Sequence, residues 1–86
     1  MPTTSVVVGS TVGLHARPAA LISEAAGNLD SDVLIGLPGT PGVDAGSALM
    51  IMTLGAAHGD TVDITGDVEA DVATIAALVV QDLDAD

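Results

Sequence analysis

The stretch "VGLHARPAALISEAAGN", residues 12–28, predicts the first helix of the chain and contains its only positive charge, Arg17. Between Ala16 and Asn28, apolar residues recur at helical spacing, and Asn is a common helix terminator. Pro18 suits the first turn, where the amide that proline lacks would have no partner inside the helix. His15 is therefore expected at or beside the N-cap. The apolar stripe consists of Pro18, Leu21, Ile22, Ala25, Ala26 and Leu29.

The start of this predicted helix has the chemistry of a phosphate site. The first backbone N–H groups of a helix lack intrahelical partners and, together with the macrodipole, favour negative charge. They disfavour a protonated imidazole, so more of His15 is expected in its neutral, nucleophilic form. If a ring nitrogen accepted a phosphoryl group, the amides of Ala16 and Arg17 and the Arg17 guanidinium would stabilise the dianion. Alternatively, His15 merely caps the helix and Arg17 merely offsets nearby charge, although Ser, Thr, Asp and Asn are better caps.

The composition indicates a single small domain over residues 1–86. The chain is 49% hydrophobic but has no Phe, Trp or Tyr, so its core must be aliphatic. The absence of cysteine excludes disulfides and thiolate metal sites. The first residues lack the features of a signal peptide, and no apolar run approaches the roughly 18 residues of a membrane span. We therefore expect a cytoplasmic protein that does not insert into membranes.

The net charge of −11 is extreme for a chain of 86 residues. Nucleic acid is excluded as a partner, because phosphate backbones require clustered Lys and Arg. Disorder requires low hydrophobicity, whereas the mean hydropathy here is +0.63. Asp predominates among the acidic residues and Lys is absent. This composition indicates either a halophilic protein with an acidic surface, working where salt screens self-repulsion, or compositional drift.

Periodicity and turn residues predict a βαββαβα chain. An α+β two-layer sandwich is the expected fold, with the helices on one face of a small, mainly antiparallel sheet. The pattern leaves the order of the strands in the sheet undetermined. The predicted elements are strands over 4–8, 31–37, 42–44 and 61–65, helices over 16–28 and 47–54, and a final helix after Asp67.

Particular residues are expected to shape these elements. Ser47 should cap the short second helix, and Val62 and Ile64 should face inward from the last strand. Asp67 is predicted to cap the final helix. The "DLDAD" tail, residues 82–86, is expected to fray into solvent. The apolar stripe of the final helix would consist of Val68, Val72, Ile75, Val79 and Leu83.

The segment "GLHARPAALISEAA", residues 13–26, resembles the phosphorylation-site signature of HPr, the histidine-containing phosphocarrier of the phosphoenolpyruvate-dependent sugar phosphotransferase system. The similarity continues through "GVDAGSALMIMTLGAAHGDTVDITGD", residues 42–67. The resemblance implies a four-stranded antiparallel sheet covered on one side by three helices. It also implies that His15 accepts a phosphoryl group on Nδ1 from phospho-Enzyme I and passes it to Enzyme IIA, with Arg17 binding the phosphate. Such a chain is a monomeric carrier, and catalysis belongs to its partners.

The resemblance assigns two further features around the second predicted helix. Ser47 matches a serine that a kinase phosphorylates in some lineages, although it is preceded here by Gly46 instead of a basic or larger residue. The alternative is that Ser47 is only a helix cap. By position, the partner-binding patch would consist of Leu21, Ala48, Leu49 and Met52; the alternative is that these side chains belong to the core.

No cofactor or metal is expected. His58, in the "AAHGD" turn, is interpreted as a solvated loop residue, because nothing in the spacing joins it to His15 and a carboxylate. "GLPGTPG", residues 36–42, lacks the Gly-Lys-Ser/Thr ending of a P-loop, and the tail lacks the central Gly and closing Glu of a calcium loop. Two other functions stay open: a regulatory or nitrogen-branch relative of HPr, and a non-phosphorylated binding module with the same fold.

Overall fold

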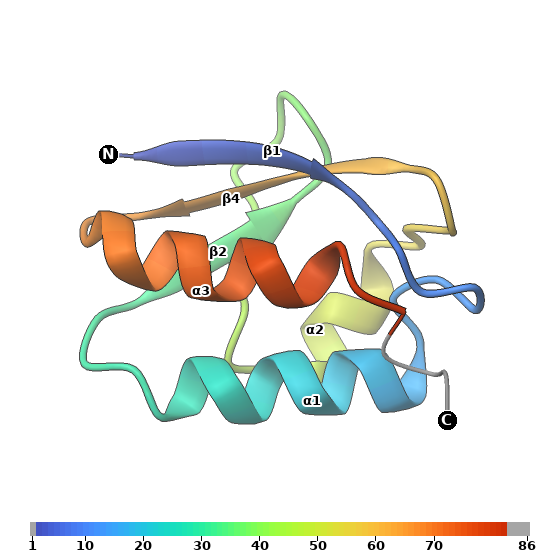
Figure 1. Cartoon of the computed structure of the whole chain (residues 1–86), viewed down its shortest axis with the longest axis horizontal. Helices are drawn as coiled ribbons and strands as arrows, with labels where there is room; N and C mark the ends of the chain where they lie inside the picture. Colours follow the sequence, from blue (N-terminus) through green and yellow to red (C-terminus); the bar gives the residue numbers. More distant parts are fainter. Residues whose placement is uncertain (1, 83–86) are drawn as a thin grey trace.

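A computed structural model describes residues 2–82 of the chain. Seven elements follow one another in the predicted order of strands and helices (Figure 1). They are β1 (Thr3–Val7), α1 (Ala16–Gly27), β2 (Val33–Gly36), β3 (Val43–Asp44), α2 (Ala48–Thr53), β4 (Thr61–Gly66) and α3 (Glu69–Val79).

The four strands form one antiparallel sheet in the order β1-β4-β2-β3. The last strand of the chain therefore lies inside the sheet and pairs with both β1 and β2. Val62 of β4 is opposite Val6 of β1, and Ile64 of β4 is opposite Ile35 of β2. The helices cover one face: α3 packs on β1 and β4, and α1 packs against α2 and α3 (Figure 1). The expected α+β sandwich is confirmed.

An aliphatic core lies between the sheet and the helices. Its members come from every layer, and full burial of each Val, Leu or Ile side chain stabilises the fold by about 1.5–3 kcal/mol. Val62 and Ile64 of β4 are fully buried, as their alternation predicts. The largest fully buried side chains are Ile22, Ile35, Ile51, Ile64, Ile75, Val8, Val62, Val72, Val79, Pro18 and Ser10.

The opposite face of the sheet is polar. The hydroxyls of Thr3 and Thr65 lie 3.1 Å apart across β1 and β4, and the Ser5 hydroxyl donates to Asp63 Oδ1 at 2.6 Å. An antiparallel sheet can expose one face in this way, because alternate side chains point to opposite sides. All the helices lie on the other face.

Three local predictions need correction. Asp67 does not cap α3: the N-cap is Val68, which makes no side-chain cap hydrogen bond, because β4 continues through Gly66 and the helix starts only at Glu69. Val68 is 43% exposed and so lies outside the buried stripe. The strand predicted over 31–37 is shorter, because β2 starts at Val33 and ends at Gly36, and Leu37 lies exposed after it. Leu83 and the last residues of the predicted tail lie outside the described residues.

Candidate functional site

His15 is the N-cap of α1, as the sequence predicts. Its backbone is extended, with φ −97° and ψ −163°, and its carbonyl accepts the Ala19 N–H at 2.8 Å. The imidazole makes no cap hydrogen bond and lies exposed. Ser, Thr, Asp or Asn at this position would use the side chain to cap the helix. His15 is therefore the N-cap through its backbone only, and its side chain is exposed and takes no part in capping.

The groups that would stabilise an anion lie directly after His15. Pro18 has no N–H, and the Ala19 N–H is used by the His15 carbonyl, so the amides of Ala16 and Arg17 are left at the helix start. The Arg17 side chain is exposed, and the first turn of α1 contains no acidic residue. Two N–H groups, the positive end of the helix dipole and one arginine therefore belong to the first turn that follows His15.

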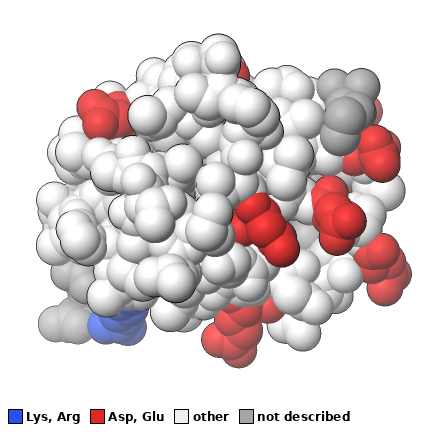
Figure 2. Space-filling model, turned by 180° about the vertical axis from the view of Figure 1, so that it is seen from behind, with Lys and Arg blue, Asp and Glu red and all other residues white. Residues whose placement is uncertain are grey.

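Carboxylates are unevenly distributed over the molecule. On the face shown in Figure 2, most acidic side chains lie toward the right of the view, and a broad area on the left carries charge only at its upper and lower edges. Between Val33 and Gly59 the only charged residue at neutral pH is Asp44. This span includes β2, β3, α2 and the turn before β4. The surface on the α2 side of the molecule is thus largely uncharged.

Exposed apolar side chains lie on α1 and α2, which pack side by side. Leu21 is 38% exposed, Leu49 70% and Met50 42%, whereas Ala48 and Met52 are half-buried against the core. The reason is helical geometry: Ile51 is fully buried, so Ala48, three residues earlier, faces the core as well, and Leu49 and Met50 face away. The sequence argument did not select Met50. The exposure of Met50 follows from the burial of Ile51, which sets the face that α2 turns toward the core.

Ser47 caps α2, as expected. Its hydroxyl accepts the Met50 N–H at 3.3 Å, and its own N–H donates to the Asp44 carbonyl at 3.1 Å. The Asp44 carboxylate accepts the Gly46 N–H at 2.8 Å, one residue before the serine. A phosphate on Ser47 would disrupt this cap and add charge near a carboxylate. Phosphorylation of Ser47 stays a prediction.

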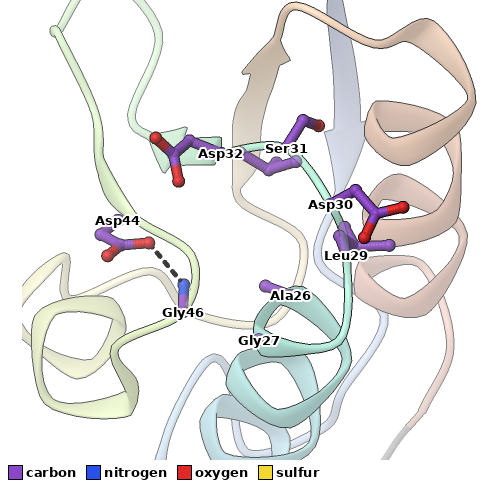
Figure 3. Close-up of a pocket in the computed structure, with 9 residues that line it drawn as sticks. Ala26, Gly27, Leu29, Asp30, Ser31, Asp32, Asp44 and Gly46 are labelled. Atoms are coloured by element: carbon purple, nitrogen blue, oxygen red, sulfur yellow. Dashed lines mark hydrogen bonds between the residues drawn. The ribbon is translucent and has the colours of Figure 1, made fainter.

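The other titratable candidates belong to other segments of the chain. His58 is exposed in the turn before β4. A hollow at the opposite end of α1 is lined by Asp30, Ser31, Asp32 and Asp44. Figure 3 shows the hydrogen bond between the Gly46 N–H and the Asp44 carboxylate in this hollow. Within residues 2–82, no group of three or more His, Cys, Asp or Glu residues could hold a metal ion.

Comparisons with known proteins identify the fold and the family. The chain superimposes on HPr-C-His from Thermoanaerobacter tengcongensis with a TM-score of 0.86 and 26% identity, covering 100% of this chain and 99% of that one. The phosphocarrier protein HPr of Bacillus anthracis str. Ames gives a TM-score of 0.82 at 33% identity, with 91% and 95% covered. The phosphocarrier protein HPr of Treponema pallidum is 34% identical over 74 residues, which are 86% of this chain and 83% of the relative.

These likenesses define a class of small phosphocarrier domains. The family model described as "PTS HPr component phosphorylation site" matches residues 2–81, so the chain belongs to the HPr family, the phosphocarriers of the phosphotransferase system. An HPr protein carries a phosphoryl group and is not itself a catalyst. In residues 2–82, no helix is long and apolar enough to cross a membrane.

Proposed function

We propose that His15 is the residue on which this HPr carries its phosphoryl group. Nδ1 of His15 attacks the phosphorus held by phospho-Enzyme I, a P–N bond forms as the bond to the donor breaks, and Enzyme IIA later takes the group. The observation that carries the proposal is an exposed imidazole at the N-terminus of α1 that makes no cap hydrogen bond. It lies two residues before the only arginine of the chain.

The surroundings suit a carrier that must also release its cargo. The amides of Ala16 and Arg17 and the Arg17 guanidinium supply a few charge-assisted hydrogen bonds to the phosphoryl oxygens. A deeply enclosed site would bind the phosphorylated state so tightly that the second transfer slowed. The exposure of His15 leaves room for the partner's reacting group.

We further propose that partners dock on the exposed apolar side chains of α1 and α2. We assign to this docking surface the exposed Leu21 of α1 and Leu49 of α2, together with the half-buried Ala48 and Met52 of α2. Met50 extends it. Because α2 carries no charge and residues 33–59 contain Asp44 as their only charged residue at neutral pH, recognition depends on apolar contact more than on ion pairs. The chain acts as a cytoplasmic monomer in this role, with one site per molecule.

We also propose that the acidic composition adapts the protein to high salt. Self-repulsion among twelve carboxylates is strong in dilute buffer and is screened when the Debye length falls to about 3 Å near 1 M salt. The free energy of unfolding, measured by urea titration in 0.1 M and 2 M KCl, should be higher in 2 M KCl. Equal values at the two concentrations would contradict this halophilic assignment.

Phosphorylation by the donor tests the central proposal. Wild-type protein is mixed with phosphoenolpyruvate and a cognate Enzyme I in high salt, and intact mass should show one acid-labile phosphate. His15→Ala should show none. An unlabelled wild type, or a labelled His15→Ala, would remove His15 as the acceptor. A regulatory or nitrogen-branch role, the second candidate, would be favoured if labelled protein failed to pass the group to any sugar-specific Enzyme IIA of the host.

A further inference from the structure

The loop that presents His15 is fastened to the C-terminal end of α3. Three consecutive loop residues each donate one hydrogen bond to that end. The Gly9 N–H donates to the Val79 carbonyl at 3.0 Å, and the Ser10 hydroxyl donates to the Gln81 carbonyl at 3.3 Å. The Thr11 N–H donates to Asp82 Oδ1 at 3.4 Å. In Figure 1 the end of α3 lies beside the chain that leaves β1.

Each side of this junction forms hydrogen bonds with polar groups of the other side. The last carbonyls of a helix have no intrahelical donors, and Gly9 supplies one to the final turn of α3. Ser10 is the only fully buried polar side chain among the described residues. Burying a hydroxyl is costly unless it forms hydrogen bonds, so its contact with Gln81 has a structural cause.

Gly9 permits a close approach that no other residue would allow. A Cβ built on Gly9 would lie 1.9 Å from the carbonyl oxygen of Val80, which is backbone and cannot rotate away. A Cβ at Gly27, in the last turn of α1, would meet nothing within 4 Å. Any side chain at position 9 must therefore move either the His15 loop or the end of α3.

The same loop is continuous with the histidine through short-range bonds. The Gly13 N–H donates to the Ser10 carbonyl at 2.9 Å, which closes a turn, and the Leu14 N–H donates to the Ala56 carbonyl at 3.0 Å. Leu14 is 2% exposed and anchors the residue before His15 in the core. Hydrogen bonds from the amides of Thr11, Gly13 and Leu14 thus restrain the backbone between Ser10 and His15.

From these contacts we propose that Gly9 and Ser10 are positioning residues for phosphoryl transfer at His15. They hold the loop against α3 and so fix where the imidazole stands relative to the first amides of α1. Transfer between two proteins requires an in-line geometry, and a displacement of about 1 Å can cost up to about a hundredfold in rate. The inference rests on the proposed function of His15.

Two substitutions, each with a matched control, test the proposal. Gly9→Ala is compared with Gly27→Ala, which adds the same methyl group in open space. Ser10→Ala is compared with Ser31→Ala, since the Ser31 hydroxyl also links a loop to α3, by a 2.6 Å bond to Asp71 near the other end of that helix. We measure kcat and KM for transfer from phospho-Enzyme I per folded molecule, and the ¹⁵N shifts of the His15 imidazole.

We expect Gly9→Ala to lower kcat about tenfold and Ser10→Ala about threefold, with KM within about twofold of wild type because the apolar docking surface is untouched. Both should shift the His15 ring signals, and neither control should.

If Gly9→Ala does not fold, Ser10→Ala alone decides. Unchanged kcat and ring signals alongside a lowered melting temperature would overturn the proposal and leave the contacts purely stabilising. A wild type that is not labelled on His15 would refute the proposed function instead, while the ring signals still test the positioning.

Discussion

The two ends of α1 offer opposite environments to an anion. At the first turn lie the exposed His15, the amides of Ala16 and Arg17 and the only guanidinium. Beyond the last turn lies the hollow lined by Asp30, Asp32 and Asp44, with no basic residue in that turn (Figure 3). The helix dipole acts in the same sense as these charges, positive at the first turn and negative at the last. The two ends of one helix therefore differ in charge, and only the first turn favours an anion.

The largest effect should come from removing His15, the proposed phosphoryl acceptor at the start of α1. His15→Ala should abolish labelling from phospho-Enzyme I, because no other group at the helix start can form the P–N bond. Intact mass after incubation measures it. His58→Ala is the matched control, since His58 is exposed and lies in a different turn. Residual labelling of His15→Ala would mean that a residue other than His15 accepts the phosphoryl group. The charge difference between the two ends of α1 would then not determine where the group binds.

Removing the cation should have the next largest effect. Arg17→Ala should lower kcat/KM for phosphoryl acceptance about ten- to a hundredfold, because a hydrogen bond to a charged group contributes about 1.5–3 kcal/mol. Arg17→Lys should recover part of this loss, since it restores the charge but not the planar fork. Stopped-flow or quench-flow transfer assays measure the rates. A rate equal to wild type in Arg17→Ala would show that the helix amides alone suffice.

A charge placed in the docking surface tests the apolar side of the same site. Leu49→Asp should raise KM for phospho-Enzyme I about tenfold, because Leu49 is 70% exposed and an unpaired carboxylate would be desolvated on docking. Val68→Asp is the control, because Val68 is 43% exposed and lies at the end of α3 away from the His15 loop. Equal KM values for Leu49→Asp and wild type would place the partner elsewhere.

The smallest effect is expected at the acidic end. Asp32→Asn removes one of three clustered carboxylates, so it should raise the melting temperature by about 2 °C in dilute buffer and have no effect in 2 M KCl, where repulsion is screened. Differential scanning calorimetry measures both values. Asp67→Asn, outside the hollow, should change the melting temperature less. A gain that persists in 2 M KCl would assign the effect to something other than charge repulsion. Neither variant should change phosphoryl transfer.

Predictions from sequence were accurate where the cause is local. The apolar spacing and Pro18 placed the start of α1, and with it the position of His15 as N-cap. Ser47 was identified as the cap of α2 for the same kind of reason. The prediction for Asp67 was wrong although the residue type is suitable, because the pairing of Gly66 with Val33 extends β4 by one residue and delays the helix.

Predictions were weaker where burial depends on a distant element. The apolar run on α2 could not show which of its side chains face solvent, and the orientation follows from Ile51 entering a core built by the sheet and the other helices. The contacts of Gly9 and Ser10 with the end of α3 join residues about seventy positions apart in the chain. No pattern within either segment indicates the other.

The sequence by itself determined the type and order of the elements and the chemistry at the start of α1. Caps, turns and amphipathic periods depend on residues within a few positions of one another, so they can be read from the chain. Only the tertiary structure decided that β4 lies between β1 and β2, which surface of α2 is exposed and what holds the His15 loop. Those features minimise the exposed apolar surface of the whole chain at once, and no single segment contains that information.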